Sequence, residues 1–129
     1  MISSPTSVLG GTGFVGSRYA AMYPDSVVEA RDCIRPTQSD TLSFVSTTSN
    51  YHPVNGDLRV DVETNLLHPL SVLPNVRGLF AQTSTWFVYG DGAGWAYYQR
   101  AREIDRCNPN GFYSITALAR EQLIRSYCE

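Results

Sequence analysis

The sequence predicts an α/β fold: a doubly wound parallel sheet, reduced to about four strands with flanking helices. Two observations carry this prediction. A short apolar strand at 6–9 runs into three glycines spaced three apart, and a helix at 14–23 follows at once. Further along the chain, strand-like segments alternate with helix-like segments, and parallel strands need such crossover connections.

The remaining strands are expected at 26–30, 41–46 and 78–83. The segment at 41–46 is short, apolar and flanked by polar residues, as is typical of a buried parallel strand. A polar loop is expected at 31–40, and a turn at 51–56. No composition shift marks a domain boundary, so the 129 residues are expected to form one domain.

Two longer helices are predicted. The first runs from Asp61, which can cap it, to about Leu73, and Pro69 inside it should bend it unless the local geometry adapts. The second begins at Asn110 and reaches the C-terminus. Their apolar stripes consist of Val62, Leu66, Leu67, Leu70 and Leu73 in the first helix and Phe112, Ile115, Ala119, Leu123 and Tyr127 in the second.

Composition narrows the classes of function. The net charge of −2 gives no basic surface for nucleic acid, and no apolar run approaches the roughly 18 residues of a membrane span. Cys33, Cys107 and Cys128 form no CxxC pair, so we expect reduced thiols in a cytoplasmic protein. His52 and His68 have no partner at ligand spacing, so no metal site is expected.

The glycine-rich turn has the pattern that holds a dinucleotide pyrophosphate. Gly10 allows a sharp turn out of the strand, Gly13 lets phosphate oxygens approach the main chain, and Gly16 lets the helix pack closely on the sheet. The helix N-terminus adds free N–H groups and a positive dipole. The residues expected to contact the cofactor here are Gly10, Gly11, Thr12, Gly13, Phe14, Val15 and Gly16.

Charged residues follow the second strand, where the ribose of the cofactor's adenosine would lie. An acidic residue there binds the ribose 2′-hydroxyl of NAD, and a basic one favours the 2′-phosphate of NADP. Asp32 favours NAD and Arg31 favours NADP, and Glu29 also lies at this strand end. We expect NAD, with NADP as the alternative.

Two further segments complete the pattern. Residues 82–90 read as a strand ending in hydroxyl side chains, and residues 111–121 as a helix with a tyrosine in its first turn. Together with the glycine turn and residues 61–67, they resemble the extended short-chain dehydrogenase/reductase family, the NAD-dependent epimerase/dehydratase type. The similarity spans nearly the whole chain and implies a Rossmann-type fold.

The resemblance also implies roles for single residues. Tyr113 would be the acid/base that moves a hydroxyl proton during hydride transfer and would also contact the cofactor. Thr85, or else Ser84, would hydrogen-bond the substrate oxygen, and Asn65 would be the polar residue that interrupts its helix near the active site. The family further implies a nucleotide-sugar substrate and a homodimer built through the two longer helices.

The sequence departs from the family in two places. All ten basic residues are arginine, and Ala117 stands where the family has a lysine four residues after the tyrosine. Arg120 lies roughly 10 Å along the helix from Tyr113 and is a poor substitute by position. Losing such a stabiliser costs about 10²–10³-fold in rate, so we expect weakened or absent turnover. The family's C-terminal substrate domain is also absent from these 129 residues.

Three interpretations therefore remain open from the sequence. The chain is an active oxidoreductase or epimerase, a non-catalytic module that binds the cofactor for regulation, or an interaction protein that keeps the fold without the ligand.

Overall fold

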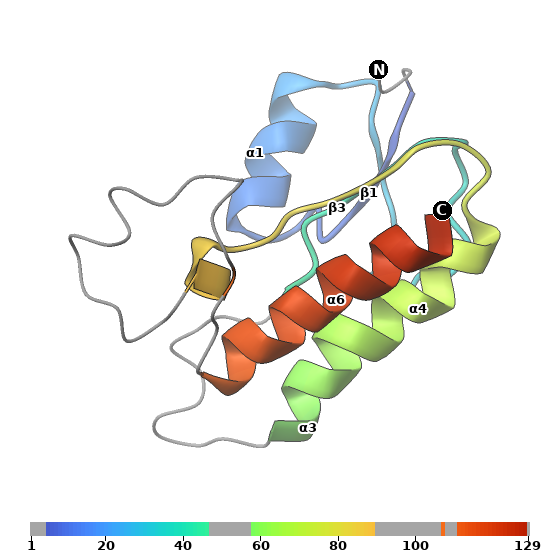
Figure 1. Cartoon of the computed structure of the whole chain (residues 1–129). Helices are drawn as coiled ribbons and strands as arrows, with labels where there is room; N and C mark the ends of the chain where they lie inside the picture. The colour runs from blue at the N-terminus through green and yellow to red at the C-terminus, as the bar shows by residue number, and fades with distance from the viewer. Residues whose placement is uncertain (1–4, 47–57, 90–106, 108–110, 129) are drawn as a thin grey trace. The chain divides into compact units, whose positions relative to one another are not determined.

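The computed structural model describes residues 5–46, 58–89, 107 and 111–128 (Figure 1). They fall into two compact units. The first unit comprises the described residues of Met1–Ser46 and His68–Thr83, and the second those of Thr47–Leu67 and Ser84–Glu129. The first unit contains the sheet and the glycine-rich turn, and the second contains the tyrosine-bearing helix.

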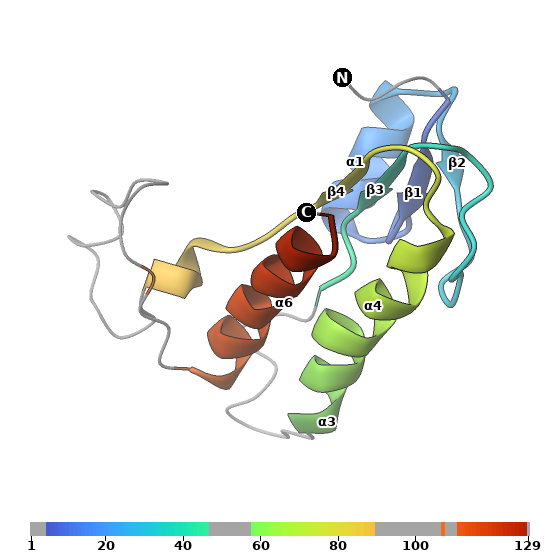
Figure 2. The ribbon, with the colours of Figure 1, turned by 45° about the vertical axis from the view of Figure 1, so that its right-hand side comes forward.

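The first unit is built on a four-stranded parallel sheet, which confirms the predicted fold class. Its strands are β1 (Ser7–Leu9), β2 (Val27–Val28), β3 (Thr41–Ser43) and β4 (Phe80–Gln82), in the order β2-β1-β3-β4 (Figure 2). All three neighbouring pairs are parallel. Every strand lies inside its predicted range but is shorter, because only two or three residues of each complete the ladder.

Helix α1 (Phe14–Met22) connects β1 to β2 and ends one residue before the predicted end at 23. Tyr19 is half-buried and packs its ring against Phe44, with centroids 5.7 Å apart. Val15 and Met22, two other apolar residues of α1, are exposed. The core of the first unit is instead formed by Val8, Leu9, Val72 and Leu73.

The first long helix is divided into four consecutive elements: α3 (Leu58–Asp61), the π-helix η1 (Val62–Leu67), α4 (His68–Val72) and the 3₁₀ turn η2 (Leu73–Asn75). Asp61 is not a cap, because the helix already includes Leu58; its carboxylate is fully buried in the first turn. The widened π turn ends two residues before Pro69, whose nitrogen cannot donate the regular i→i−4 hydrogen bond. The local geometry thus adapts to the proline.

The second unit contains α3, η1, the 3₁₀ turn η3 (Trp86–Tyr89) and helix α6 (Phe112–Cys128). Helix α6 lies alongside α3 and η1 (Figures 1 and 2). The predicted apolar stripe of α6 does not form its buried face. Ser114, Thr116, Ala117 and Arg120 are buried instead, while four stripe residues are exposed: Phe112, Ile115, Leu123 and Tyr127.

The predicted turn at 51–56 and the predicted start of the last helix at Asn110 lie outside the described residues. In the part of the chain that is described, no helix is both long and apolar enough to cross a bilayer. Within the same residues, no three His, Cys, Asp or Glu side chains gather as metal ligands would. All three cysteines are free thiols.

Candidate functional site

The β1–α1 turn has the tight geometry that its glycines predict. Gly10 has a φ of +73°, a conformation that residues with a Cβ rarely adopt, and its carbonyl accepts a hydrogen bond of 3.2 Å from the Gly13 N–H. Gly16 is buried, and a Cβ there would lie 2.9 Å from both the Gly10 carbonyl carbon and Gly11 Cα. The close approach of Gly16 is therefore to the turn itself, not to the sheet as predicted.

Gly11 is required for a reason that the sequence does not reveal. A Cβ at Gly11 would lie 2.7 Å from Cγ1 of Val28, so β2 passes directly over the turn. Two of the predicted cofactor contacts, Gly11 and Gly16, are thus buried packing positions. They shape the turn from within.

Gly13 is different, because the space beside it is open. It is the N-cap of α1, with extended backbone (φ −76°, ψ 177°) and no side-chain cap. A Cβ at Gly13 would meet only the Gly10 carbonyl oxygen, at 3.4 Å, and both Thr12 and Gly13 are exposed. The first turn of a helix leaves N–H groups without partners in the helix. Open backbone at such a helix start fits an anionic group like a pyrophosphate.

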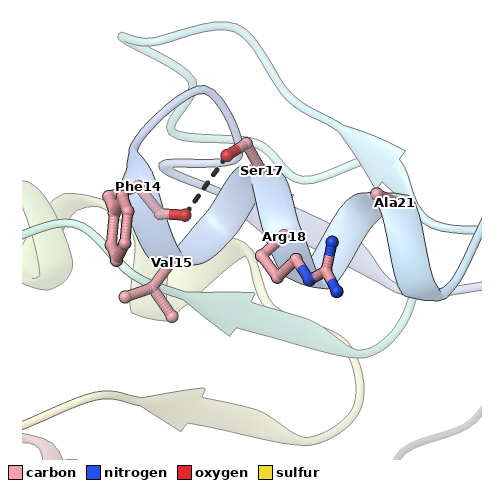
Figure 3. Close-up of a pocket in the computed structure, with 5 residues that line it drawn as sticks. All are labelled: Phe14, Val15, Ser17, Arg18 and Ala21. Atoms are coloured by element: carbon pink, nitrogen blue, oxygen red, sulfur yellow. Dashed lines mark hydrogen bonds between the residues drawn. The ribbon is translucent and has the colours of Figure 1, made fainter.

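Phe14 and Val15 follow the turn at the start of α1 and line a separate hollow on the outer face of the helix (Figure 3). Ser17, Arg18 and Ala21 complete its lining. Phe14 is 96% exposed and Val15 57%, and the Phe14 carbonyl accepts a 3.2 Å hydrogen bond from the Ser17 hydroxyl. These side chains point away from the turn's interior, so their predicted contribution to phosphate binding would come from their backbone N–H groups.

At the end of β2, the carboxylate of Glu29 is occupied by the protein's own donors. Its Oε1 accepts hydrogen bonds from the Ser7 hydroxyl (2.6 Å), the Thr37 hydroxyl (2.6 Å) and the Thr37 N–H (2.7 Å). Glu29 therefore ties the 31–40 loop to β1. The other charged candidates, Arg31 and Asp32, are exposed on that loop.

The surroundings of Glu29 and Cys33 also shift the pKa values of both side chains. Burial raises the pKa of Glu29, but hydrogen bonds from Ser7 and Thr37 outweigh it, so the carboxyl has a lowered pKa. Burial, reinforced by the charges of Glu29 and Asp32, raises the pKa of the Cys33 thiol. Cys33 is therefore a neutral thiol at neutral pH, not a reactive thiolate.

Replacing Glu29 with glutamine is expected to lower the stability at pH 7 by about 1 kcal/mol, a value reduced for the partial exposure of the group. Because the folded pKa is lowered, Glu29 stabilises the fold above its unfolded pKa, and this contribution disappears as the pH falls through the folded pKa. Urea unfolding from pH 7 to pH 3 should show parent and variant converging at low pH. Glu63→Gln, an exposed change, is the control; a pH-independent gap for Glu29→Gln would contradict this account.

In the second unit, the structure brings two of the predicted catalytic residues to the same helix pair. Tyr113 is half-buried in the first turn of α6, and its backbone carbonyl accepts a 2.8 Å hydrogen bond from the Thr116 hydroxyl. Asn65 is fully buried in the π-helix η1, and its Nδ2 donates to the same Thr116 hydroxyl at 3.0 Å. Thr116 thus joins the π turn to the turn that carries Tyr113.

Arg120 belongs to the same cluster, although its position in the sequence gave no reason to include it. It is 1% exposed, and its Nη1 donates to Asn65 Oδ1 at 3.4 Å. Burial lowers the pKa of the guanidinium, while electrostatic interaction with Tyr113 and Glu121 acts in the opposite direction. An arginine is rarely fully buried without such partners. The burial of Arg120 marks it as part of this cluster, and burial cannot be seen in the sequence.

The two hydroxyl candidates after β4 differ in their surroundings. The Ser84 hydroxyl donates a short hydrogen bond to the Glu121 carboxylate on α6. Thr85 is half-buried at the start of η3, where its carbonyl accepts a 3.5 Å hydrogen bond from the Val88 N–H. Ser84 is therefore engaged with the protein.

The parallel sheet and its glycine-rich β1–α1 turn define a Rossmann-type fold. Solved structures with this fold include a short-chain dehydrogenase/reductase superfamily protein from Agrobacterium tumefaciens with bound NAD (TM-score 0.75, 20% identity) and RMD from Pseudomonas aeruginosa complexed with NADPH (0.73, 21%). UDP-glucuronic acid 4-epimerase from Bacillus cereus in complex with NAD is also similar (0.70, 17%). The match covers 95% of this chain in each case.

The chain spans about half the length of these solved chains: 44%, 47% and 52%, respectively. No family model matches the sequence, and no curated protein matches it. At these identities the likeness establishes the fold. The predicted Rossmann-type fold is thus confirmed.

Proposed function

We propose that this chain binds NAD, with NADP as the alternative, and belongs to the epimerase/dehydratase kind, with hydride and proton transfer weakened or lost. The observation that carries the proposal is the β1–α1 turn. Gly10 has a positive φ, Gly16 is packed against the turn, and Gly13 leaves bare backbone at the open N-terminus of α1. A pyrophosphate needs such a close approach to main-chain N–H groups.

At the ribose side, the occupied carboxylate of Glu29 leaves two other charged residues to recognise the cofactor. Asp32 would accept a hydrogen bond from the 2′-hydroxyl of NAD, while Arg31 would favour the 2′-phosphate of NADP. The two exposed side chains have opposite preferences. The proposed order, NAD before NADP, rests on Asp32.

In the second unit, Tyr113 would act as the acid/base and would contact the cofactor. Thr85 would hydrogen-bond the substrate oxygen, in preference to Ser84, whose hydroxyl is engaged by Glu121. Asn65 would hold the π turn beside the tyrosine helix through Thr116. The cofactor, when bound, supplies the hydride acceptor; these side chains would orient the substrate and move its proton.

Ala117 is the reason to expect little turnover. A methyl group gives neither a positive charge nor a donor, and losing a stabiliser of this kind costs about 10²–10³-fold in rate. This favours the alternative that the chain is a non-catalytic cofactor-binding module with a regulatory or interaction role. Turnover assays with nucleotide sugars would separate the two: hydride exchange supports an enzyme, and binding without exchange supports a module.

A homodimer and a nucleotide-sugar substrate complete the proposal. Four apolar side chains of α6 are 39–57% exposed, and Leu67 of η1 is 52% exposed. Exposed apolar stripes on helices are typical of surfaces that a second copy covers. The free cysteines are in keeping with a cytoplasmic location. We also propose that residues 1–129 form one NAD(P)-binding domain.

The test is a titration of NADH, followed by its fluorescence. We expect saturable binding by the parent chain and none by Gly13→Leu, because a side chain at Gly13 fills the open space where phosphate would approach. Ala21→Leu, an exposed change on the same helix, is the matched control and should bind as the parent does. No binding by the parent, or equal binding by Gly13→Leu, would overturn the proposal.

A further inference from the structure

Arg120 is the largest fully buried side chain among the described residues, with 1% of its surface exposed. Removing a guanidinium from water is unfavourable unless hydrogen bonds and neighbouring charges compensate. Its place in the structure therefore requires an explanation beyond helix packing.

The direction of the side chain provides one. Side chains on a helix lean toward the turn that precedes them, so Arg120 leans toward Thr116 and Ala117. Its Nη1 donates to Asn65 Oδ1 at 3.4 Å, and Asn65 Nδ2 donates to the Thr116 hydroxyl at 3.0 Å. The guanidinium is thus anchored at the level of Thr116, one helical turn closer to Tyr113 than its own Cα.

Ala117 is the small residue beside this position. It is fully buried and lies three residues before Arg120, on the same side of α6. A long side chain at 117 would compete for the buried volume that the arginine stem crosses. A positively charged one would also place a second cation beside the first, in surroundings of low dielectric constant.

We propose that Arg120 is a positioning residue, the cation of the cluster formed by Asn65, Thr116 and Arg120 beside Tyr113, and that it fixes the Asn65 carboxamide against Thr116. In this proposal, the small side chain of Ala117 leaves the space that the arginine side chain occupies. The acid/base role of the neighbouring Tyr113 rests on the proposed function, whereas the contacts among Asn65, Thr116 and Arg120 do not depend on it. One consequence is that Ala117→Lys alone cannot rebuild a lysine site, because Arg120 already occupies the space.

The test is a double-mutant cycle on the full chain, measured by urea unfolding: parent, Ala117→Lys, Arg120→Met, and both together. We expect Arg120→Met to reverse part of the destabilisation caused by Ala117→Lys, so that the double variant is more stable than Ala117→Lys alone. Ala119→Lys, next to Ala117 but half-buried, is the matched control and should be additive with Arg120→Met. Additivity for Ala117→Lys would overturn the proposal.

A second measurement decides the matter even if Ala117→Lys fails to fold. In Arg120→Met, hydrogen exchange of the Asn65 side-chain amide, assigned with an Asn65 variant, should accelerate about tenfold or more. In Arg120→Lys, which keeps the charge, it should remain near the parent rate. Equal exchange in the methionine and lysine variants would contradict a positioning role. Neither measurement involves a cofactor, so a failure to bind NADH would leave this inference standing.

Discussion

Gly16→Ala is expected to destabilise the fold by about 3 kcal/mol, although alanine is the better helix former. A Cβ at this position would collide with the Gly10 carbonyl oxygen and lie 2.9 Å from Gly11 Cα. These are backbone atoms held by the hydrogen bond from the Gly13 N–H to the Gly10 carbonyl, so they cannot move aside without opening the turn. The midpoint of urea unfolding measures the effect.

Gly13→Ala is the matched comparison for this prediction. Its Cβ would meet only one atom, at 3.4 Å, which is ordinary contact, so the cost in stability should stay below about 1 kcal/mol. The two glycines would thus separate into one required by the fold and one kept open for a ligand. A Gly16→Ala variant as stable as the parent would show that the turn is not packed as described.

Asn65→Leu is expected to cost about 3 kcal/mol, because two buried groups lose a hydrogen bond at once. Asn65 accepts from the Arg120 guanidinium and donates to the Thr116 hydroxyl, and it is fully buried. Leucine has a similar volume, so the loss would reflect polarity and not a cavity. Denaturant unfolding gives the free energy directly.

Two controls make the Asn65 prediction specific. Asn65→Asp keeps an acceptor for the guanidinium and should cost less than the leucine variant. Glu63→Leu introduces the same side chain at an exposed position of the same π turn and should be nearly neutral. If Asn65→Leu were no worse than Glu63→Leu, the buried cluster would not contribute to stability.

The sequence predicted the sheet and the glycine turn well because both depend on local patterns. Alternation of short apolar strands with helices leads to a parallel sheet. A sharp turn from a strand into a helix needs a glycine, which Gly10 supplies. The packing of Gly16 on the turn was missed, since it depends on where the Gly10 carbonyl points.

The tyrosine cluster was only partly predictable. Its buried face is polar, with Ser114, Thr116 and Arg120, whereas the periodicity of α6 favoured the apolar stripe that proves exposed. Hydrophobic periodicity identifies a helix, but it cannot show which face is buried when the packing partner presents a polar side chain such as Asn65. The partner of Arg120 lies 55 residues earlier in the chain, so no local pattern connects them.

The hydrogen bonding of Glu29 was also not predictable, because it too depends on contacts between distant segments. Its place after β2 suggested a ligand for the ribose, but Ser7 and Thr37 converge on it from separate segments. Which charged group at a strand end stays available to a cofactor is decided by such tertiary contacts.

The central claim is that the β1–α1 turn receives the cofactor's pyrophosphate on bare main chain. The most direct measurement is a ¹H–¹⁵N correlation spectrum of the chain titrated with NAD. The account predicts that the backbone amides of residues 11–16 show the largest shifts and that Gly13→Leu abolishes them. Saturable shifts that leave those amides unmoved, or a spectrum unchanged by NAD, would contradict it.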